Sequence, residues 1–270
     1  MIEQITQTVD FLKDKITSSP QTAIILGSGL DALSEDICVE KEIDYADIPH
    51  FPLSTVRGHA SKLLIGTLNG IPVLAMKGRF HYYEGYSMEE VTYPVRIFKA
   101  LGINNLILSN ASGGMNPNYK IGDIVLITDH INHFPENPLR GANHEQLGVR
   151  FPDMSETYSL RLRNLAKTAA QKGNIELKEG IYVGTSGPTF ETPAEYVMFR
   201  RFGADCVGMS TVPEAIVAKH AGMECIAFSI ITDLGIEGKI EKVSHNEVLM
   251  AAKNAEPTLR WLVKEILKSI

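Results

Sequence analysis

The chain has 270 residues, of which 44% are hydrophobic, enough for a large buried core in one α/β domain or two small ones. Its 32 acidic and 26 basic residues give a net charge of −6, which excludes the broad basic face that nucleic acid or an anionic membrane requires. No apolar run approaches the roughly 20 residues of a membrane span, and the first residues do not resemble a signal peptide. We therefore expect a soluble, cytoplasmic protein that binds neither nucleic acid nor membrane.

The three cysteines, Cys38, Cys206 and Cys225, lie in or beside apolar stretches, with neither metal-ligand spacing nor a CxxC pair. Reduced, buried thiols of a cytosolic enzyme are the plainest interpretation of this pattern. The sequence predicts no metal site.

The first third of the chain contains a helix pattern and then strand patterns. Apolar residues recur at three- and four-residue intervals over 2–16 and predict an amphipathic opening helix. Residues 22–26 form a short apolar strand pattern. Lys62–Leu68 and Ile71–Met76 flank Asn69-Gly70, a turn pair that favours a tight hairpin.

From residue 95 onward, helix and strand patterns alternate, apart from an irregular segment rich in Pro, His and Asn over 129–153. Alternation of this kind predicts one α/β domain over 1–270, with a central sheet covered by helices on both sides. The predicted strands are 105–109, 123–128, 180–185, 205–209 and 223–232. The predicted helices cover 95–101 and 157–172, begin at 192–193 and at 211–214, and end with 246–270, kinked at Pro257.

Glycine-rich or polar clusters follow most of the predicted strands. In open α/β sheets the ligand crevice lies at the carboxyl ends of the strands. Clusters drawn from the whole chain length therefore predict one crevice of the kind an enzyme uses. They lie at 27–29, 78–85, 110–114, 186–192, 208–211 and 232–235.

The two clusters in the first third of the chain could bind an anion. Arg79 and His81 could grip phosphate oxygens while Glu84 holds the other imidazole nitrogen; the alternative is a solvated turn. Backbone N–H groups at 27–29 could also face an anion, or the segment could simply be a strand-to-helix turn.

Three further clusters carry equally open interpretations. Residues 110–114 could cradle a phosphate oxygen or let a flat base approach closely, or they could form only a tight turn. Phe190 could cover a base whose N–H groups donate to Glu191, or Glu191 could be only a first-turn acid. Ser210 and its neighbours could bind phosphate or merely cap a helix.

The order and spacing of the motifs, unlike each motif singly, are highly specific. From around residue 20 to the C-terminus they closely resemble the trimeric purine nucleoside phosphorylases. The resemblance implies a single α/β domain with a twisted mixed sheet, partly closed into a barrel and flanked by helices. It also implies a homotrimer and no cofactor beyond inorganic phosphate as co-substrate. The motifs are Gly27–Leu30, Arg57–His59, Gly78–Tyr86, Ser109–Gly114, Asn137–Gly141, Gly187–Thr192 and Val207–Glu214.

The resemblance also assigns roles to individual positions. Phosphate donors correspond to Ser28, His59, Arg79, His81, the backbone N–H of Ala111, and Ser210. Sugar contacts correspond to Tyr83, Met209 and His245, and base contacts to Phe190, Glu191 and Asp233. Phe151 corresponds to a phenylalanine that the neighbouring subunit contributes. The expected catalytic side chains are His81, Glu191 and Asp233.

The chemistry implied for such a site is coherent. Breaking a glycosidic bond to nitrogen develops positive charge at C1′ of the sugar and negative charge on the leaving purine. A phosphate below the ring would stabilise and capture the cation, and a donor to N7 would help the base to leave. The sequence shows no Ser-His-acid or Cys-His signature, and this route needs no covalent enzyme nucleophile.

One position departs from the family pattern. Members specific for 6-oxopurines carry asparagine, commonly followed by lysine, where this chain has Asp233-Leu234. An amide both donates and accepts hydrogen bonds, whereas a carboxylate only accepts. An aspartate at this position resembles the methylthioadenosine phosphorylases, which take 6-aminopurines. The 5′-thiomethyl group of their substrate would need an apolar pocket where His245 is expected. We expect 6-oxopurine nucleosides to be the better substrates, with adenosine cleavage as a side activity.

A non-catalytic nucleotide-binding module is the alternative from another class of protein. It would explain the glycine-rich turns. It would not explain why Arg79, His81 and Ser210, from distant segments, should converge on one anion.

Overall fold

The computed structural model describes residues 1–27, 31–53 and 61–270. Its helices are α1 (Ile2–Lys13), α2 (Met88–Ala100), α3 (Leu160–Lys172), α4 (Pro193–Arg201), α5 (Val212–His220) and α6 (His245–Leu267). Its strands are β1 (Thr22–Ile25), β2 (Ile37–Asp44), β3 (Lys62–Leu68), β4 (Ile71–Lys77), β5 (Asn105–Gly114), β6 (Ile124–Asn132), β7 (Leu177–Gly184), β8 (Cys206–Gly208) and β9 (Glu224–Leu234). Short 3-10 turns at 31–36, 45–47, 82–84 and 145–147 complete these elements.

The strands form one mixed sheet in the order β2-β3-β4-β1-β5-β8-β7-β6-β9. Strand β9 also pairs with β5, in parallel, so the run from β5 through β8, β7 and β6 to β9 closes on itself. Strands β2, β3 and β4 form an antiparallel extension that joins the rest through β1. The predicted α/β fold, a mixed sheet partly closed into a barrel and flanked by helices, is confirmed.

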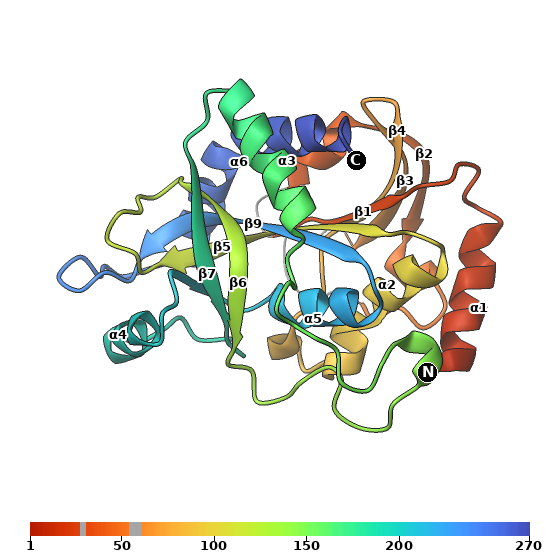
Figure 1. Ribbon diagram of the computed structural model, residues 1–270, viewed down its shortest axis with the longest axis horizontal. Helices are drawn as coiled ribbons and strands as arrows, with labels where there is room; N and C mark the ends of the chain where they lie inside the picture. The colour runs from red at the N-terminus through yellow and green to blue at the C-terminus, as the bar shows by residue number, and fades with distance from the viewer. Residues whose placement is uncertain (28–30, 54–60) are drawn as a thin grey trace.

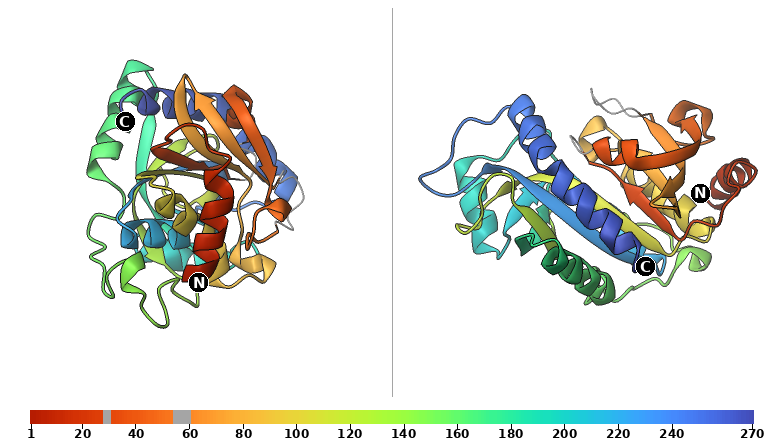
Figure 2. Two further views of the ribbon diagram at one scale, coloured as in Figure 1. Left: turned by 90° about the vertical axis from the view of Figure 1, so that its right-hand side faces the viewer. Right: turned by 90° about the horizontal axis from the view of Figure 1, so that it is seen from above.

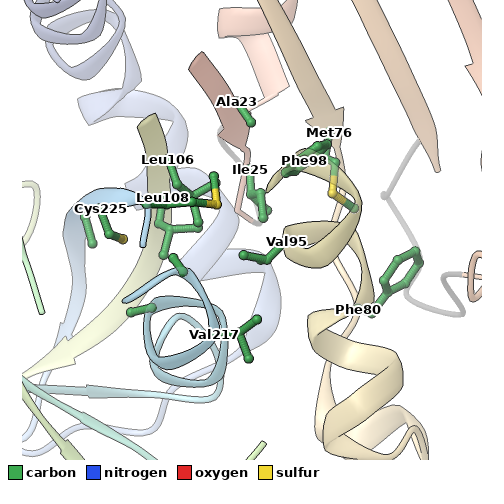
Figure 3. Packing of buried hydrophobic residues seen from close by; sticks show 14 of the residues in the cluster. Ala23, Ile25, Met76, Phe80, Val95, Phe98, Leu106, Leu108, Val217 and Cys225 are labelled. Carbon is green, nitrogen blue, oxygen red and sulfur yellow. The ribbon is translucent and has the colours of Figure 1, made fainter. Parts of the chain in front are cut away.

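Helices cover the sheet on both sides. In Figure 1, α3 and α6 lie above the strands and α2 and α5 below them, with α1 beside α2. Figure 2 shows the length of α6 lying over the sheet when the molecule is seen from above. One hydrophobic cluster includes α1, α2 and α5, and a second includes α3 and α6. In the first, Ile25 of β1 lies between Leu106 and Leu108 of β5 on one side and Phe98 of α2 on the other (Figure 3).

Local signals explain several element boundaries. Asn69 and Gly70 both have positive φ angles, 52° and 78°, as the predicted tight hairpin requires. Helix α4 begins where predicted, because Thr192 accepts from Glu195 N while the Glu195 carboxylate accepts from Thr192 N. Similar capping boxes begin α2 at Ser87 and α6 at Ser244.

Three expectations from the sequence differ from the structure. Strands β5 and β9 continue to Gly114 and Leu234, so residues 110–114 and most of 232–235 are strand rather than a loop after it. Each strand supplies the other with backbone partners there, which sequence periodicity does not reveal. Strand β2 was not predicted, because its charged middle is exposed. Cys38 lies on β2 and is exposed, whereas Cys206 and Cys225 are buried as expected.

Candidate active site

A cavity of about 360 Å³ lies where five of the six predicted polar clusters meet; residues 28 and 29 of the sixth fall outside the described residues. Its walls come from the segment after β4, the end of β5, the segment before α4, the β8–α5 junction, the end of β9 and the start of α6. Ten of the thirteen predicted site residues line it: Arg79, His81, Tyr83, Ala111, Phe190, Glu191, Met209, Ser210, Asp233 and His245. The expectation of one crevice built from distant segments is correct.

The other three predicted site residues lie elsewhere. Ser28 and His59 fall outside the described residues. Phe151 lies on the surface of the single chain, with 87% of it exposed. The exposed ring leaves its predicted role, in the site of a neighbouring subunit, untested.

Arg79 lines the cavity, although only 2% of it is exposed. Its Nε donates to Glu214 Oε1 over 3.0 Å. Its Nη1 donates to the Ser109 carbonyl at 2.6 Å and lies 3.3 Å from Ser210 Oγ. A buried guanidinium held by a carboxylate and a carbonyl has a fixed orientation, so the alternative of a solvated turn is excluded.

His81 is held by Glu84, as the sequence suggested. Both its backbone N–H and its ring Nδ1 lie within hydrogen-bond distance of Glu84 Oε1, at 2.8 and 2.9 Å. Burial lowers the pKa of the imidazole, and the Glu84 carboxylate opposes that shift. A carboxylate at Nδ1 favours the tautomer with its hydrogen on Nδ1 and thereby orients the ring.

An unusual backbone conformation positions Ser210. Thr211 has φ 70° and ψ −49°, and Val212 N donates to the Ser210 carbonyl over 2.7 Å across it. This tight turn is strained for a β-branched residue. The Thr211 hydroxyl does not cap α5 as predicted; it accepts from Asn110 Nδ2 at 2.8 Å. Because Asn110 in turn accepts from Ser229 at 2.6 Å, strands β5 and β9 hold the turn in place.

Two carboxyl groups, those of Glu191 and Asp233, also line the cavity. Burial raises the pKa of Glu191 to about 7; a hydrogen bond from Thr185 opposes the rise, and the nearby Asp233 adds to it. Burial also raises the pKa of Asp233, which is 8% exposed. The first-turn acid of α4 is Glu195, and Glu191 precedes the N-cap Thr192, so Glu191 is not the first-turn acid that the alternative required.

Both oxygens of Asp233 accept hydrogen bonds. Tyr196, on α4, donates from its phenol to Oδ2 over 3.0 Å, and Thr232 donates to Oδ1 over 3.0 Å. These bonds oppose the effect of burial on the pKa of Asp233. Sequence reasoning did not identify Tyr196, because nothing in a helical tyrosine signals a partner 37 residues away.

The three residues expected to contact the sugar also line the cavity. The rings of Tyr83 and His81 are stacked, with centroids 4.6 Å apart and planes 18° apart. Burial raises the pKa of Tyr83 to about 12, so its phenol stays neutral. His245 is the first residue of α6, and Met209 packs so close to Gly187 that a Cβ there would come within 2.4 Å of its sulfur.

Glu214 and Asn110 also support the site, and sequence reasoning assigned them no role. A signal for Glu214 exists in the sequence, because an acid inside an apolar helix start needs a buried cation nearby.

Within the described ranges 1–27, 31–53 and 61–270, no group of three or more His, Cys, Asp or Glu side chains could hold a metal ion. Nor does any helix in these ranges have the length and apolar character to cross a membrane.

A closed mixed sheet with a polar cavity at its strand ends is typical of an enzyme acting on a small molecule. Residues 21–268 match the phosphorylase superfamily. The chain is 50% identical over 266 residues to purine nucleoside phosphorylase 1 of Geobacillus stearothermophilus, covering 98% of this chain and 97% of that one. The chain belongs to the phosphorylase superfamily and, within it, to the purine nucleoside phosphorylases.

Solved structures agree in fold. Isoform 2 of purine nucleoside phosphorylase from Schistosoma mansoni, in complex with cytosine and ribose-1-phosphate, has a TM-score of 0.94 and 40% identity, covering 99% of this chain and 96% of that one. The Schistosoma mansoni purine nucleoside phosphorylase in complex with adenosine has a TM-score of 0.93 and 37% identity, covering 100% and 98%.

Proposed function

We propose that this protein cleaves the N-glycosidic bond of purine ribo- and deoxyribonucleosides with inorganic phosphate, giving free base and pentose 1-phosphate. One observation carries the proposal: a cation with a neighbouring hydroxyl, Arg79 with Ser210, and a pair of neighbouring carboxyl groups, Glu191 and Asp233, line the same cavity. An anion and a purine could therefore occupy one cavity together, with the sugar between them. The family of the chain supports the same activity.

Phosphate would bind at the end formed by Arg79, His81 and Ser210, with the backbone N–H of Ala111. A guanidinium can give two parallel hydrogen bonds to a phosphate. His81 Nε2 would donate when the ring is charged and would accept the P–O–H hydrogen of hydrogenphosphate when it is neutral. Ser28 and His59 would add donors, according to the resemblance, and no further cofactor is proposed.

The reaction would use the bound phosphate as the nucleophile. As the glycosidic bond lengthens, positive charge at C1′ would be stabilised and then captured by the dianion. Tyr83, Met209 and His245 would hold the sugar, with His245 near the 5′-hydroxyl. Orientation of both reactants in one cavity supplies a large share of such rate enhancements.

The purine would leave as its negative charge is neutralised. Phe190 would cover one face of the base, and the Glu191 carboxylate would accept from N1–H and from the 2-amino group of guanine. Asp233 would donate to N7 as the neutral acid, and as the anion it would accept from a 6-amino group. With its raised pKa, Asp233 suits a cycle that uses both forms, and adenosine would be a secondary substrate.

A methylthioadenosine phosphorylase is the second candidate, and Asp233 is the observation that favours it. The 5′-thiomethyl group of that substrate calls for an apolar wall near the 5′ position. His245 lines this cavity together with Val248. We favour the nucleoside enzyme because an imidazole suits a 5′-hydroxyl better.

We further propose that the chain works as one domain within a cytoplasmic homotrimer, in which Phe151 completes the site of the adjacent subunit. An aromatic ring that is 87% exposed in the single chain supports this. Val149, two residues earlier, is also largely exposed, so the segment offers a small apolar surface.

The test of the function is direct. Inosine, guanosine, adenosine and methylthioadenosine are incubated with the protein, with and without phosphate, and free base is measured by chromatography. We expect base release from inosine and guanosine only with phosphate, and slower release from adenosine. Equal release without phosphate would show a hydrolase, and release from methylthioadenosine alone would support the second candidate.

A further inference from the structure

Tyr196 holds a cavity side chain although it lies outside the set of residues that line the cavity. It sits on α4, only 3% of it is exposed, and its hydroxyl donates to Asp233 Oδ2 over 3.0 Å. Asp233 is in the cavity wall. Any effect of Tyr196 on the base must therefore pass through the carboxyl group of Asp233.

Two glycines make room for this tyrosine. A Cβ on Gly235 would lie 2.1 Å from Tyr196 Cδ1, which is closer than real Cβ contacts come. A Cβ on Gly113 would lie 3.1 Å from the Tyr196 hydroxyl and 2.9 Å from Asp233 Oδ2. The end of β5 and the residue that follows β9 thus leave space for the ring and its hydroxyl, and the contact with Asp233 is closely fitted.

An irregularity in the sheet places the second donor. Ser112 pairs with Ile231 and Gly113 with Asp233, so Thr232 is an extra residue in β9. Such bulges re-aim side chains beside active sites. The Thr232 hydroxyl lies 3.0 Å from Asp233 Oδ1 and 3.2 Å from the Ser112 carbonyl. The single hydrogen of the Thr232 hydroxyl can be donated to either acceptor, whereas the Tyr196 hydroxyl donates to Asp233.

We propose that Tyr196 is a positioning residue that sets the base preference: by donating to Oδ2, its hydroxyl keeps Asp233 in the accepting form that suits a 6-amino group. This inference rests on the proposed function and adds a specificity-determining residue to it. A carboxylate only accepts, whereas the neutral acid donates, so whatever favours one form favours one class of base. A buried phenol that donates to a carboxylate favours the charged form.

Other ionisable groups also line the cavity and can affect which form of Asp233 is favoured. Glu191, from the segment before α4, disfavours a second negative charge beside it. The remaining titratable residues of the cavity wall are Arg79 and His81 from the segment after β4, His245 at the start of α6, and Tyr83, whose phenol is neutral. Removing the Tyr196 hydroxyl takes away one hydrogen-bond donor to the Asp233 carboxylate, so the pKa of Asp233 rises and the neutral, donating form becomes more populated.

The experiment compares wild type with Tyr196→Phe, which keeps the ring in its niche. We expect the ratio of kcat/KM for adenosine to that for inosine to fall roughly tenfold in the pH range over which Asp233 changes form, since losing a hydrogen bond to a charged group has about this effect on the charged form. The pH at which this ratio changes should move upward. Thr232→Val, which removes the other donor, should act in the same direction. Tyr119→Phe is the matched control, because this buried hydroxyl donates to the Glu179 carbonyl at 2.7 Å, outside the cavity.

A second measurement separates this inference from the proposed function. Equilibrium binding of adenine and hypoxanthine to wild type and Tyr196→Phe needs no turnover, and adenine should lose affinity relative to hypoxanthine. In an Asp233→Asn background, Tyr196→Phe should no longer move the pH midpoint. Suppose that wild type cleaves both nucleosides but Tyr196→Phe changes neither the ratio of kcat/KM, nor the pH at which this ratio changes, nor the affinities for the two bases. The role proposed for Tyr196 is then wrong. If wild type cleaves neither with phosphate, the proposed function fails, while base binding still tests Tyr196.

Discussion

Arg79 and Glu214 form a buried ion pair across 135 residues of sequence, with Nε of the arginine 3.0 Å from Oε1 of the glutamate. The side chains are 2% and 3% exposed. Because the carboxylate occupies Nε, the guanidinium cannot turn, and its Nη1 stays directed at Ser109 and Ser210. The pair therefore fixes the guanidinium at the proposed phosphate site, and the Glu214 carboxylate offsets its positive charge until an anion binds.

Arg79→Ala should abolish efficient use of phosphate. The change removes a charge-assisted contact to a dianion, so phosphorolysis should fall by orders of magnitude and the KM for phosphate should rise. It also leaves Glu214 buried without its cation, which costs about 3–5 kcal/mol of stability. Thermal unfolding must therefore be followed beside the kinetics. Arg161→Ala, at the exposed pair with Glu224, is the control; near-normal phosphorolysis by Arg79→Ala would place the phosphate elsewhere.

Glu214→Gln tests what the carboxylate contributes. An amide oxygen can still accept from Arg79 Nε, but the negative charge beside the guanidinium is gone. An incoming dianion then meets a more positive site, so the KM for phosphate should fall several-fold. Glu214→Ala loses the acceptor as well and should raise this KM. Initial rates at varied phosphate decide the matter: a rise of equal size in both variants would mean that the charge itself is needed to hold Arg79.

Glu191 should impose a pH dependence on guanosine cleavage. Its pKa of about 7 in the free protein means that the accepting carboxylate forms as pH rises through neutrality. The kcat/KM for guanosine should therefore rise through about pH 7. Glu191→Gln should remove this limb and lower activity strongly, since each unpaired donor of the base costs about 1–3 kcal/mol. Glu179→Gln, at an exposed pair with Lys167, is the matched control. Retention of most activity by Glu191→Gln would point to another anchor for the base.

Phe151 should matter for activity but little for the stability of a single chain. Phe151→Ala removes an exposed ring, so we expect a raised KM for inosine without a large change in unfolding temperature. Phe202→Ala, which removes a ring that is 59% exposed at the end of α4, is the matched control and should change neither. Light scattering gives the assembly state, and a fully active monomer would rule out the shared site.

Several parts of the fold and of the site could be predicted from the sequence, because they are local motifs. The Asn69-Gly70 hairpin, the Thr192 cap and the Glu84 contact to His81 each depend on residues a few positions apart. The positions taken from the family motifs also converge, and ten of them line one cavity.

What the sequence could not show are contacts between distant segments. The Glu214 contact to Arg79 and the Tyr196 contact to Asp233 span 135 and 37 residues. Strand β5 extends through Gly114 only because β8 and β9 lie beside it. Thr211 was expected to cap a helix, and its hydroxyl instead accepts from a side chain of β5. Periodicity and turn chemistry carry no information about such partners.

Asp233→Asn should move the preference for base toward 6-oxopurines. In wild type the buried carboxyl accepts from Tyr196 and Thr232, and with its raised pKa it can switch between donor and acceptor as pH changes. An amide does not titrate: its oxygen can accept from Tyr196, and its NH₂ can then donate to N7 or O6 at every pH. The ratio of kcat/KM for inosine to that for adenosine should therefore rise and lose the part of its pH dependence that Asp233 contributes. Initial rates with both nucleosides from acidic to alkaline pH measure this; a ratio that stays at the wild-type value at every pH would mean that Asp233 does not read the 6-position.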